Sequence, residues 1–361
     1  MKIQKSDIAQ KLKLIKSIVP PKAMASEAGI LVKGKELIAN DLELAVIAKL
    51  QVLSDEEFVL PVAAINLIES LPDEIIDISS KENKVTIKSS CGKSTFTTIF
   101  PEQFPEVVIN ENDCTDSITI DTESFVNSVS KVLFACNTAV AKAQLRGIYL
   151  DGDGEYLNIV ASDGFRLAWD RIKCNNNFNC IVPKTALQKL ISFDMGKKME
   201  FCRYKNSKAV FKSDEYTVST SLIDGSFIDY KAVFRATPQT RFEVNAKTML
   251  GSISRSLIAS EKHIESPVIL KRDSDRKVLS IHRNGSTYSF NEEMMSEFDN
   301  EKEMLVGINA KYLVESIKAT EGDKLLIDFV NDHSPLIIND NQFRQIILPV
   351  RLSERMKEAI E

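Results

Sequence analysis

The stretch ASDGFRLAWD at residues 161–170 contains the groups of a hydrolytic site. Ser162, Asp163 and Arg166 would supply a nucleophile, a carboxylate and a guanidinium within five positions. The earlier stretch AND at residues 39–41 repeats the aspartate, but it lacks the arginine and the aromatic residue around it. An aspartate shared by two similar stretches favours a turn-stabilising role, because aspartate side chains commonly accept hydrogen bonds from nearby backbone amides. A hydrolase that uses Asp163 with Arg166 is therefore the disfavoured alternative.

Metal and cofactor chemistry has little support in the sequence. The acidic run LDGDGE at residues 150–155 begins like a calcium-binding loop, but Tyr156 replaces the required glycine and Ser162 the final glutamate, so we expect a hairpin turn. The chain has three histidines, at 263, 282 and 333, and six cysteines without CxxC pairs, at 91, 114, 136, 174, 180 and 202. This usage indicates reduced thiols without zinc. No glycine-rich nucleotide-binding loop occurs, so we expect no cofactor.

The bulk composition is that of an ordinary soluble protein. A chain of 361 residues is long enough for two or three domains, and 43% of it is hydrophobic and 27% charged. No apolar run approaches the ~18 residues of a membrane span, and the N-terminus lacks the apolar core of a signal peptide. We therefore expect a cytoplasmic protein without a membrane partner. The net charge of −5 speaks against a general nucleic-acid binder unless the charge is unevenly distributed.

A threefold internal repeat organises the chain. Two families of short amphipathic segments recur, each with a helix-starting residue and apolar residues at helical spacing. The first family lies at 60–74, 182–196 and 308–322, and the second at 6–20, 121–135 and 244–259. Between the helices, 34–50 resembles 154–172, the third copy at 275–294 is weaker, and hairpin-like pairs follow the second helix of each unit.

The repeat predicts an α+β fold in which each unit has two helices packed on antiparallel sheets. The units should span residues 1–115, 116–238 and 239–352, and a helical tail should follow at 353–361. The six helical segments carry eleven lysines and arginines against five acidic residues, a net charge of +6 in a chain whose total is −5. If equivalent helices share one surface, an acidic protein presents a basic face. The plainer interpretation, that helix surfaces are simply rich in lysine, stays open.

Three stretches identify a family. LRGIYLDGDGEYLNIVASDGFRLA at 145–168, SLIDGSFIDY at 221–230 and QIILPVRL at 345–352 resemble the bacterial sliding clamp, the β subunit of DNA polymerase III. The resemblance covers residues 1–352. It implies three clamp domains and a non-catalytic processivity subunit, two copies of which close head to tail into a homodimeric ring. In such a ring, helices line the hole around double-stranded DNA and antiparallel sheets form the outside.

The resemblance also implies a DNA-facing surface on the helices. Lysine and arginine on such a lining attract phosphates without reading the base sequence. Flexible lysine suits sliding better than bidentate arginine, and the counted helices hold ten lysines to one arginine. The expected DNA-facing residues, with two just outside the counted helices, are Lys11, Lys13, Lys16, Lys22, Lys131, Lys142, Arg146, Lys184, Lys189, Lys247, Arg255, Lys311 and Lys318.

A second implied site is an apolar cleft between domains 2 and 3. In the family it receives a short motif, a glutamine followed by large apolar residues, from the DNA polymerase III α subunit, the clamp loader δ subunit, other polymerases and repair proteins. Phe165, Ile228 and Ala232 stand where the family commonly has histidine, proline and arginine, so the cleft is more apolar and its preferred motif should differ. The implied cleft residues are Leu145, Ser162, Gly164, Phe165, Arg166, Leu167, Ile228, Ala232, Val233, Asn309, Tyr312, Pro335, Ile346, Leu348, Pro349, Val350, Arg351 and Leu352.

Ring closure and the tail complete the expectations. By resemblance, Ile258 and Ala259 of domain 3 meet the domain 1 strand STFTTIF at 94–100, which contributes Thr95 and Thr97 and is rich in threonine where the family often has larger apolar groups. We expect the tail at 353–361 to be a frayed extension; a tail that lies across the cleft and competes with partners is the alternative. The alternative function is that of a divergent clamp paralogue, a protein-interaction scaffold that does not encircle DNA.

Overall fold

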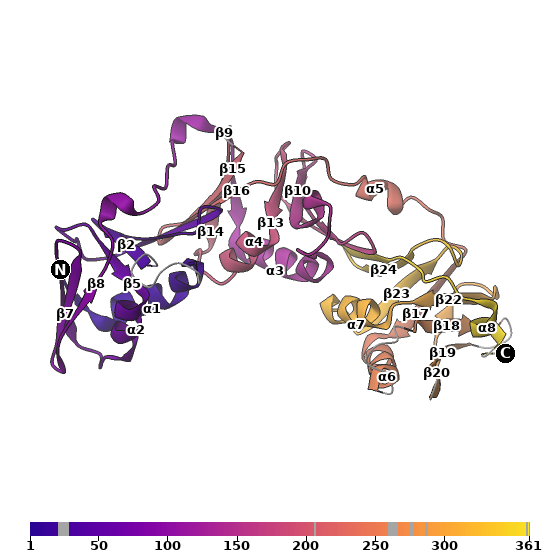
Figure 1. The fold of residues 1–361 in the computed structure, drawn as a ribbon. Coiled ribbons are helices and arrows are strands. Elements are labelled where there is room, and N and C mark those ends of the chain that lie inside the picture. The colour runs from indigo at the N-terminus through magenta and orange to yellow at the C-terminus, as the bar shows by residue number, and fades with distance from the viewer. Residues whose placement is uncertain are drawn as a thin grey trace. The chain divides into compact units, whose positions relative to one another are not determined.

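The computed structural model describes residues 1–20, 29–205, 207–258, 266–273, 277–285, 288–358 and 360. The chain forms two compact units, coloured along the sequence in Figure 1. The first unit comprises Met1–Val126 and Thr185–Ile223, and the second comprises Asn127–Lys184 and Asp224–Glu361. Among the described residues, no helix is long and apolar enough to cross a membrane.

The first unit contains two antiparallel sheets and a helix pair. The large sheet has the strand order β5-β2-β3-β4-β16-β15-β14-β9, and the small sheet has the order β1-β6-β7-β8. The strands of this unit are β1 (Lys2–Gln4), β2 (Gly29–Lys33), β3 (Glu36–Asn40), β4 (Leu44–Lys49), β5 (Phe58–Pro61), β6 (Ile75–Lys81), β7 (Lys84–Ser89), β8 (Gly92–Thr97), β9 (Cys114–Asp121), β14 (Lys198–Tyr204), β15 (Lys208–Lys212) and β16 (Tyr216–Ser221).

Helices α1 (Lys5–Ile15) and α2 (Val62–Ser70) pack side by side in this unit (Figure 1). Ile8, Leu12 and Ile15 of α1 are fully buried, and their spacing places them on one helix face. Ala64, Ile65 and Ile68 do the same for α2. Two further helices, α3 (Thr122–Val132) and α4 (Lys184–Leu190), begin or end at the division between the two units.

The second unit repeats this plan. Its large antiparallel sheet has the order β13-β10-β11-β12-β25-β24-β23-β17-β21, and its small sheet has the order β20-β19-β18-β22. The strands are β10 (Gly147–Gly152), β11 (Tyr156–Ser162), β12 (Arg166–Lys173), β13 (Asn179–Pro183), β17 (Thr240–Asn245), β18 (Val268–Arg272), β19 (Val278–Asn284), β20 (Ser289–Met295), β21 (Glu297–Phe298), β22 (Met304–Ile308), β23 (Lys324–Phe329), β24 (Leu336–Asp340) and β25 (Phe343–Ile347).

Helices α6 (Ala246–Ile258) and α7 (Ala310–Ala319) pack against each other in the second unit, which also holds the short α5 (Tyr230–Val233) and α8 (Glu354–Glu358). The six helices predicted from the repeat are therefore all present as α1, α2, α3, α4, α6 and α7. The predicted α+β fold with antiparallel sheets is confirmed. The acidic run at 150–155 is a hairpin turn, as expected, because β10 pairs with β11 in antiparallel register across it.

Each large sheet joins strands from different sequence repeats. In the first unit β4 pairs with β16, with Leu44 opposite Thr220. In the second unit β12 pairs with β25, with Arg166 opposite Ile347. Backbone hydrogen bonding across these seams merges neighbouring repeats, which is why two compact units form from a threefold sequence pattern. The repeat boundaries at 115 and 238 remain a prediction from the sequence.

Candidate docking site and nucleic-acid interface

The turn at residues 162–166 is held by its own polar side chains. The Asp163 carboxylate accepts hydrogen bonds from the backbone amides of Phe165 at 2.9 Å and Arg166 at 3.0 Å. The Ser162 hydroxyl donates to the Arg166 carbonyl at 2.7 Å and accepts from the Gly164 amide at 3.1 Å. Gly164 has a φ of 91°, which a side chain would strain. The hydroxyl and the carboxylate are therefore both engaged in shaping the turn.

The same turn occurs in the first unit. The Asp41 carboxylate accepts from the amides of Glu43 at 3.0 Å and Leu44 at 2.7 Å, and Leu42 has a φ of 77° in the place of Gly164. A strand then seals each turn: the amide of Ser221 donates to the Glu43 carbonyl, and that of Leu348 donates to the Phe165 carbonyl at 2.8 Å. The predicted turn-stabilising role of Asp163 is confirmed, and nothing in this geometry is specific to hydrolysis.

Arg166 is buried behind the turn rather than exposed in a cleft. Its side chain is 8% exposed. The guanidinium donates to Asp163 at 3.0 Å, to the Phe134 carbonyl at 2.6 Å and to Glu315 of α7. Its central carbon lies 4.3 Å from the ring centre of Tyr312. Arg166 thus ties β12 to α7 and orients Tyr312, so it is a positioning residue with no donor free for a bound peptide.

We expect Arg166→Met to destabilise the protein by about 3–5 kcal/mol, because the buried Asp163 carboxylate would lose its counterion. Urea unfolding followed by circular dichroism measures the change. Glu315→Gln is the control: Glu315 is half exposed, and its pair with Arg166 should contribute less than about 1 kcal/mol. Equal small losses in both variants would contradict the buried role of Arg166.

The remaining cleft residues come from five segments of the second unit. Pairing of β12 with β25 sets Leu167 opposite Ile346, and pairing of β24 with β25 sets Leu336, next to Pro335, opposite Ile347. A Cβ added at Gly164 would lie 3.8 Å from Leu145. The Asn309 side chain caps α7 by accepting from the amides of Lys311 and Tyr312. The structure therefore gathers most of the predicted cleft around one strand seam.

The segment 227–234 is anchored beside this seam by aromatic residues. Tyr230 and Phe234 are buried in one cluster with Leu167 and Ile346, and Val233 packs against it. Burial raises the pKa of Tyr230, with the Asp151 carboxylate adding to the effect, so the protonated hydroxyl donates to Asp151 at 2.6 Å. This anchor holds the exposed Ile228 and Ala232 next to the cluster.

The surface around the seam is apolar. Phe165 is 62% exposed, and Leu348, whose amide bonds to the Phe165 carbonyl, is 37% exposed. Val350 and Ile228 are exposed to a similar degree. Large exposed apolar side chains gathered at one place mark an interaction site more often than an ordinary surface. Leu167 and Ile346, which the sequence also assigned to the cleft, are buried and form its floor.

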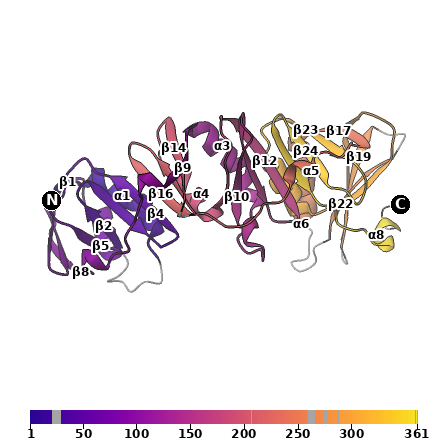
Figure 2. The same cartoon turned by 90° about the horizontal axis from the view of Figure 1, so that it is seen from above.

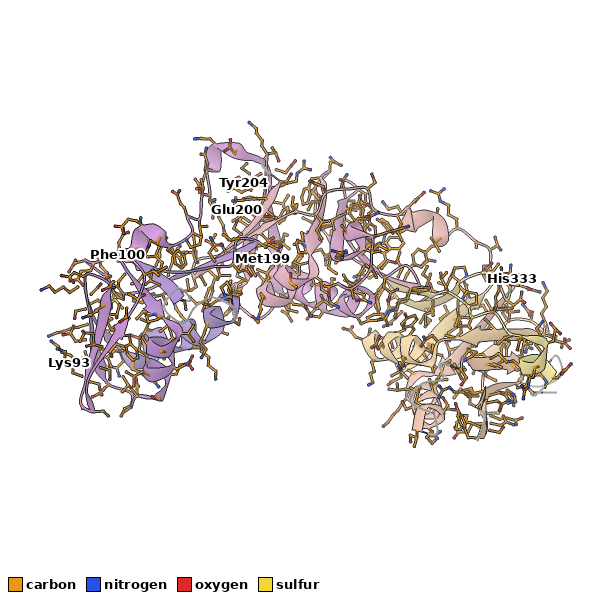
Figure 3. The ribbon with its side chains drawn as sticks, in the orientation of Figure 1. Lys93, Phe100, Met199, Glu200, Tyr204 and His333 are labelled. Atoms are coloured by element: carbon orange, nitrogen blue, oxygen red, sulfur yellow. The ribbon has the colours of Figure 1, made fainter. Side chains whose placement is uncertain are left out.

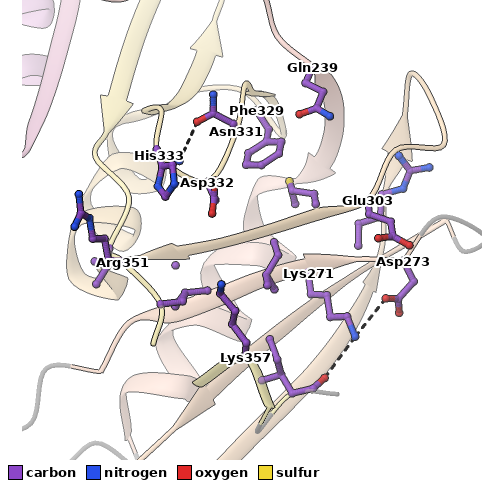
Figure 4. Close-up of a pocket in the computed structure, with 17 residues that line it drawn as sticks. Gln239, Lys271, Asp273, Glu303, Phe329, Asn331, Asp332, His333, Arg351 and Lys357 are labelled. Atoms are coloured by element: carbon purple, nitrogen blue, oxygen red, sulfur yellow. Dashed lines mark hydrogen bonds and ion pairs between the residues drawn. The ribbon is translucent and has the colours of Figure 1, made fainter. Parts of the chain in front are cut away.

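A cavity of about 860 Å³ lies beyond the far end of this surface (Figure 4). It is lined by Val350, Arg351 and Leu352 and by residues that the sequence did not single out, among them Lys271, Asn331, His333 and Lys357. His333 lies on the loop between β23 and β24 (Figure 3). The missed signal was local: Leu352, Met356 and Ile360 recur at the spacing of one helix face, which marks the tail as a packing element.

Several of the predicted DNA-facing cations have partners within the protein. Lys11 pairs with Glu215, Lys16 with Glu69 at 2.8 Å and Lys131 with Glu321 at 3.0 Å. Arg255 forms a two-pronged pair with Glu292 at 2.6 and 2.7 Å. Lys184 donates to the Cys136 carbonyl, and Arg146 donates to the carbonyls of Val140 and Ala141. These cations contribute less free charge than the sequence count indicates.

Other predicted cations are unpaired. Within the described part of the chain, no ion pair or side-chain hydrogen bond engages Lys13 of α1, Lys142, Lys189 of α4, Lys247 of α6 or Lys318 of α7. Lys311 is exposed on α7. Lys22 lies outside the described residues. The unpaired lysines of the helices come from all three sequence repeats.

The predicted interface residues lie at sheet and helix ends. Thr95 and Thr97 are exposed on β8, the edge strand of the small sheet in the first unit. Ile258 ends α6 and is 83% exposed. Ala259 lies outside the described residues.

Comparison with known proteins shows which fold and family these features belong to. A structure of the DNA polymerase III subunit beta from Pseudomonas aeruginosa matches with a TM-score of 0.90 at 21% identity, covering 98% of this chain and 100% of that one. A DNA polymerase III beta subunit structure from Thermotoga maritima matches with a TM-score of 0.87 at 23% identity, covering 98% and 99%. The protein therefore has the DNA clamp fold.

The sequence comparisons place the chain in a family. The family models described as "DNA polymerase III beta subunit, central domain" and "DNA polymerase III beta subunit, C-terminal domain" match residues 119–229 and 231–351. The beta sliding clamp of Staphylococcus epidermidis is 23% identical over 365 residues, 93% of this chain and 95% of that protein, and the beta sliding clamp of Bacillus subtilis is 22% identical over 295 residues, 79% and 77%. The chain belongs to the DNA polymerase III beta subunit family, whose members are non-catalytic processivity factors of DNA replication.

Proposed function

We propose that this protein is a DNA sliding clamp with three domains at residues 1–115, 116–238 and 239–352. Two copies close head to tail around duplex DNA in the cytoplasm and tether the replicative polymerase. The observation that carries this proposal is the set of unpaired lysines on helices of all three repeats, Lys13, Lys189, Lys247 and Lys318, in a chain that is acidic overall. Mobile ammonium groups attract phosphates without fixing a register, which sliding requires.

Ring closure is supported by two complementary sheet edges. β8 ends the small sheet of the first unit and β20 ends the small sheet of the second, so each presents a row of backbone groups that can pair with another strand. Lys93 lies on β8 (Figure 3), and Lys88 lies opposite it on β7. Glu292 and Glu293 lie on β20. A basic edge meeting an acidic edge fits a head-to-tail contact, which closes a ring when repeated.

We expect the parent protein to sediment as a dimer at micromolar concentration and Ile258→Asp to sediment as a monomer. The isoleucine is exposed in the single chain, so the substitution should leave the fold unchanged while placing a charge in the apolar contact. Analytical ultracentrifugation measures the shift. Leu53→Asp, at another exposed apolar residue, should stay dimeric. A parent protein that is strictly monomeric would contradict an autonomous ring.

The docking part of the proposal rests on the apolar surface around Phe165 and Leu348. An extended peptide with large apolar side chains would cover these residues, and the backbone groups at the strand seam would orient it. The proposed partners are the DNA polymerase III α subunit, the clamp loader δ subunit, other polymerases and repair proteins. Because Phe165 and Ala232 add no charge, we expect a preference for apolar over charged residues at the matching motif positions.

A loader-dependent polymerase processivity assay on primed circular DNA tests the function as a whole. Addition of the protein should lengthen the products made in one binding event, and linear DNA with free ends should lose the effect because a ring slides off. Equal short products with and without the protein would remove the proposal.

A second candidate is a clamp paralogue that serves as an interaction scaffold without encircling DNA. The internal pairing of Lys11, Lys16, Lys131 and Arg255 favours it, because these pairs reduce the charge available to phosphates. The scaffold would bind partner peptides yet leave processivity unchanged, so the two assays together distinguish the candidates.

A further inference from the structure

The C-terminal tail is packed on the protein and is not a frayed extension, contrary to the sequence-based expectation. Its helix α8 spans Glu354–Glu358 and lies beside β22 (Figures 1 and 2). Ile360 is 9% exposed, and Leu352 and Met356 are half buried. Their spacing of four residues puts all three side chains on one face of a helical turn. The tail therefore has a buried apolar side.

The tail covers the outer face of the small sheet of the second unit. On β18, Val268 and Leu270 point into the core, so Ile269 and Lys271 point to the opposite face. Ile269 is nevertheless only 2% exposed. The Lys271 ammonium group donates to the Ile360 carbonyl at 3.4 Å and lies 3.3 Å from Asp273 (Figure 4). An apolar sheet face that would otherwise meet water is thus closed at the tail.

The segment just before the tail is pressed onto the neighbouring strand. The Val350 amide donates to the Gly307 carbonyl of β22 at 2.8 Å, and these residues form an isolated bridge. A Cβ at Gly307 would stand 2.6 Å from Leu352 and 2.9 Å from the Val350 carbonyl oxygen. Only glycine allows this approach. One bridge and one apolar contact are the described attachments of residues 350–352 to β22.

The cavity of about 860 Å³ separates this segment from the loop that carries His333. Residues 350–352 and the tail residues Lys357 and Ile360 line the same cavity. The open side of the wall therefore has no packed support of its own. A segment held by few contacts opens easily unless another element holds it.

We propose that the tail is a strut: the packing of Met356 and Ile360 on the small sheet holds residues 348–352 in the geometry that docks a partner peptide. This inference rests on the proposed docking function of that surface. A wall already ordered before binding costs less conformational entropy when the peptide arrives. The two residues act through Leu348 and Val350 and are positioning residues.

The test compares two faces of one short helix in the full-length protein. Met356→Ala with Ile360→Ala removes the buried face, and Arg355→Ala with Glu358→Ala removes the exposed face. The probe is a fluorescein-labelled peptide with a glutamine followed by leucine and phenylalanine, titrated by fluorescence anisotropy. We expect about tenfold weaker binding for the first variant, because wall side chains must then be ordered on binding, and no change for the second.

Hydrogen–deuterium exchange reports on the strut without a peptide. The Val350 amide should exchange faster in the Met356→Ala, Ile360→Ala protein than in the parent, while the melting temperature stays the same. Ile360→Val, which keeps an apolar contact, should restore both slow exchange and peptide affinity.

Each outcome decides something. Unchanged Val350 exchange, or peptide binding that is unchanged or tighter in the buried-face variant, overturns the strut; tighter binding would mean that the tail competes with partners. If the parent protein does not bind the peptide, the docking proposal fails, and faster exchange at Val350 would still support the tail as the holder of this wall.

Discussion

Replacing Lys13, Lys189 and Lys247 with glutamate should shorten retention on primed circular DNA by about a hundredfold at physiological salt. These three lysines lie on α1, α4 and α6, one in each sequence repeat, and none has a partner in the described part of the chain. Each phosphate contact releases about one counterion, which is worth roughly fivefold in affinity at ~0.15 M salt, so three lost contacts multiply to that range. The decay of clamp-bound DNA in a loader-dependent assay measures the change.

The matched control carries the same change of net charge at a different place. Lys35, Lys173 and Lys205 are exposed lysines in turns or at strand ends, so their replacement with glutamate should leave retention nearly unchanged. If both triple variants lose retention equally, bulk charge and not a helix surface would explain the attraction. If neither loses it, the lining assignment is wrong and the scaffold candidate gains support.

Replacing Phe165 and Leu348 with aspartate should weaken binding of a partner peptide by about a hundredfold or more, because truncating central apolar anchors commonly costs over ~2 kcal/mol. Both side chains are exposed in the free protein, so the fold does not depend on them. In the complex each carboxylate would face apolar peptide side chains without a counterion. Fluorescence anisotropy with a labelled motif peptide measures the affinity, and circular dichroism checks the fold.

A paired control separates this site from general surface hydrophobicity. Leu53 and Ile75 are at least as exposed as Leu348 but lie in the first unit, so their replacement with aspartate should leave peptide affinity unchanged. Retained DNA sliding by the Phe165→Asp, Leu348→Asp protein would show that docking and sliding use different surfaces. Peptide affinity retained by that protein would remove the docking assignment.

The sequence by itself determined the local structure. Apolar residues at helical spacing predicted all six repeat helices, and strand-like alternation predicted the hairpins, because both signals arise from neighbours a few residues apart. The turn at Asp163 was also predictable, since its hydrogen bonds join residues at most three positions apart and the same aspartate recurs at Asp41. The family followed from three stretches that lie on the seam between β12 and β25 or on the linker beside it.

The tertiary structure alone decided which charged groups are free and which side chains are exposed. Lys11 meets Glu215 and Arg255 meets Glu292, partners that lie 204 and 37 residues away, so counting charges along helices overestimated the free positive charge. Arg166 looked like a cleft residue, yet it is buried between Asp163, Phe134 and Glu315. The tail looked frayed until Ile360 was found against β18, 89 residues from Lys271. Ion pairing and burial depend on contacts between distant segments, and only the folded chain brings those segments together.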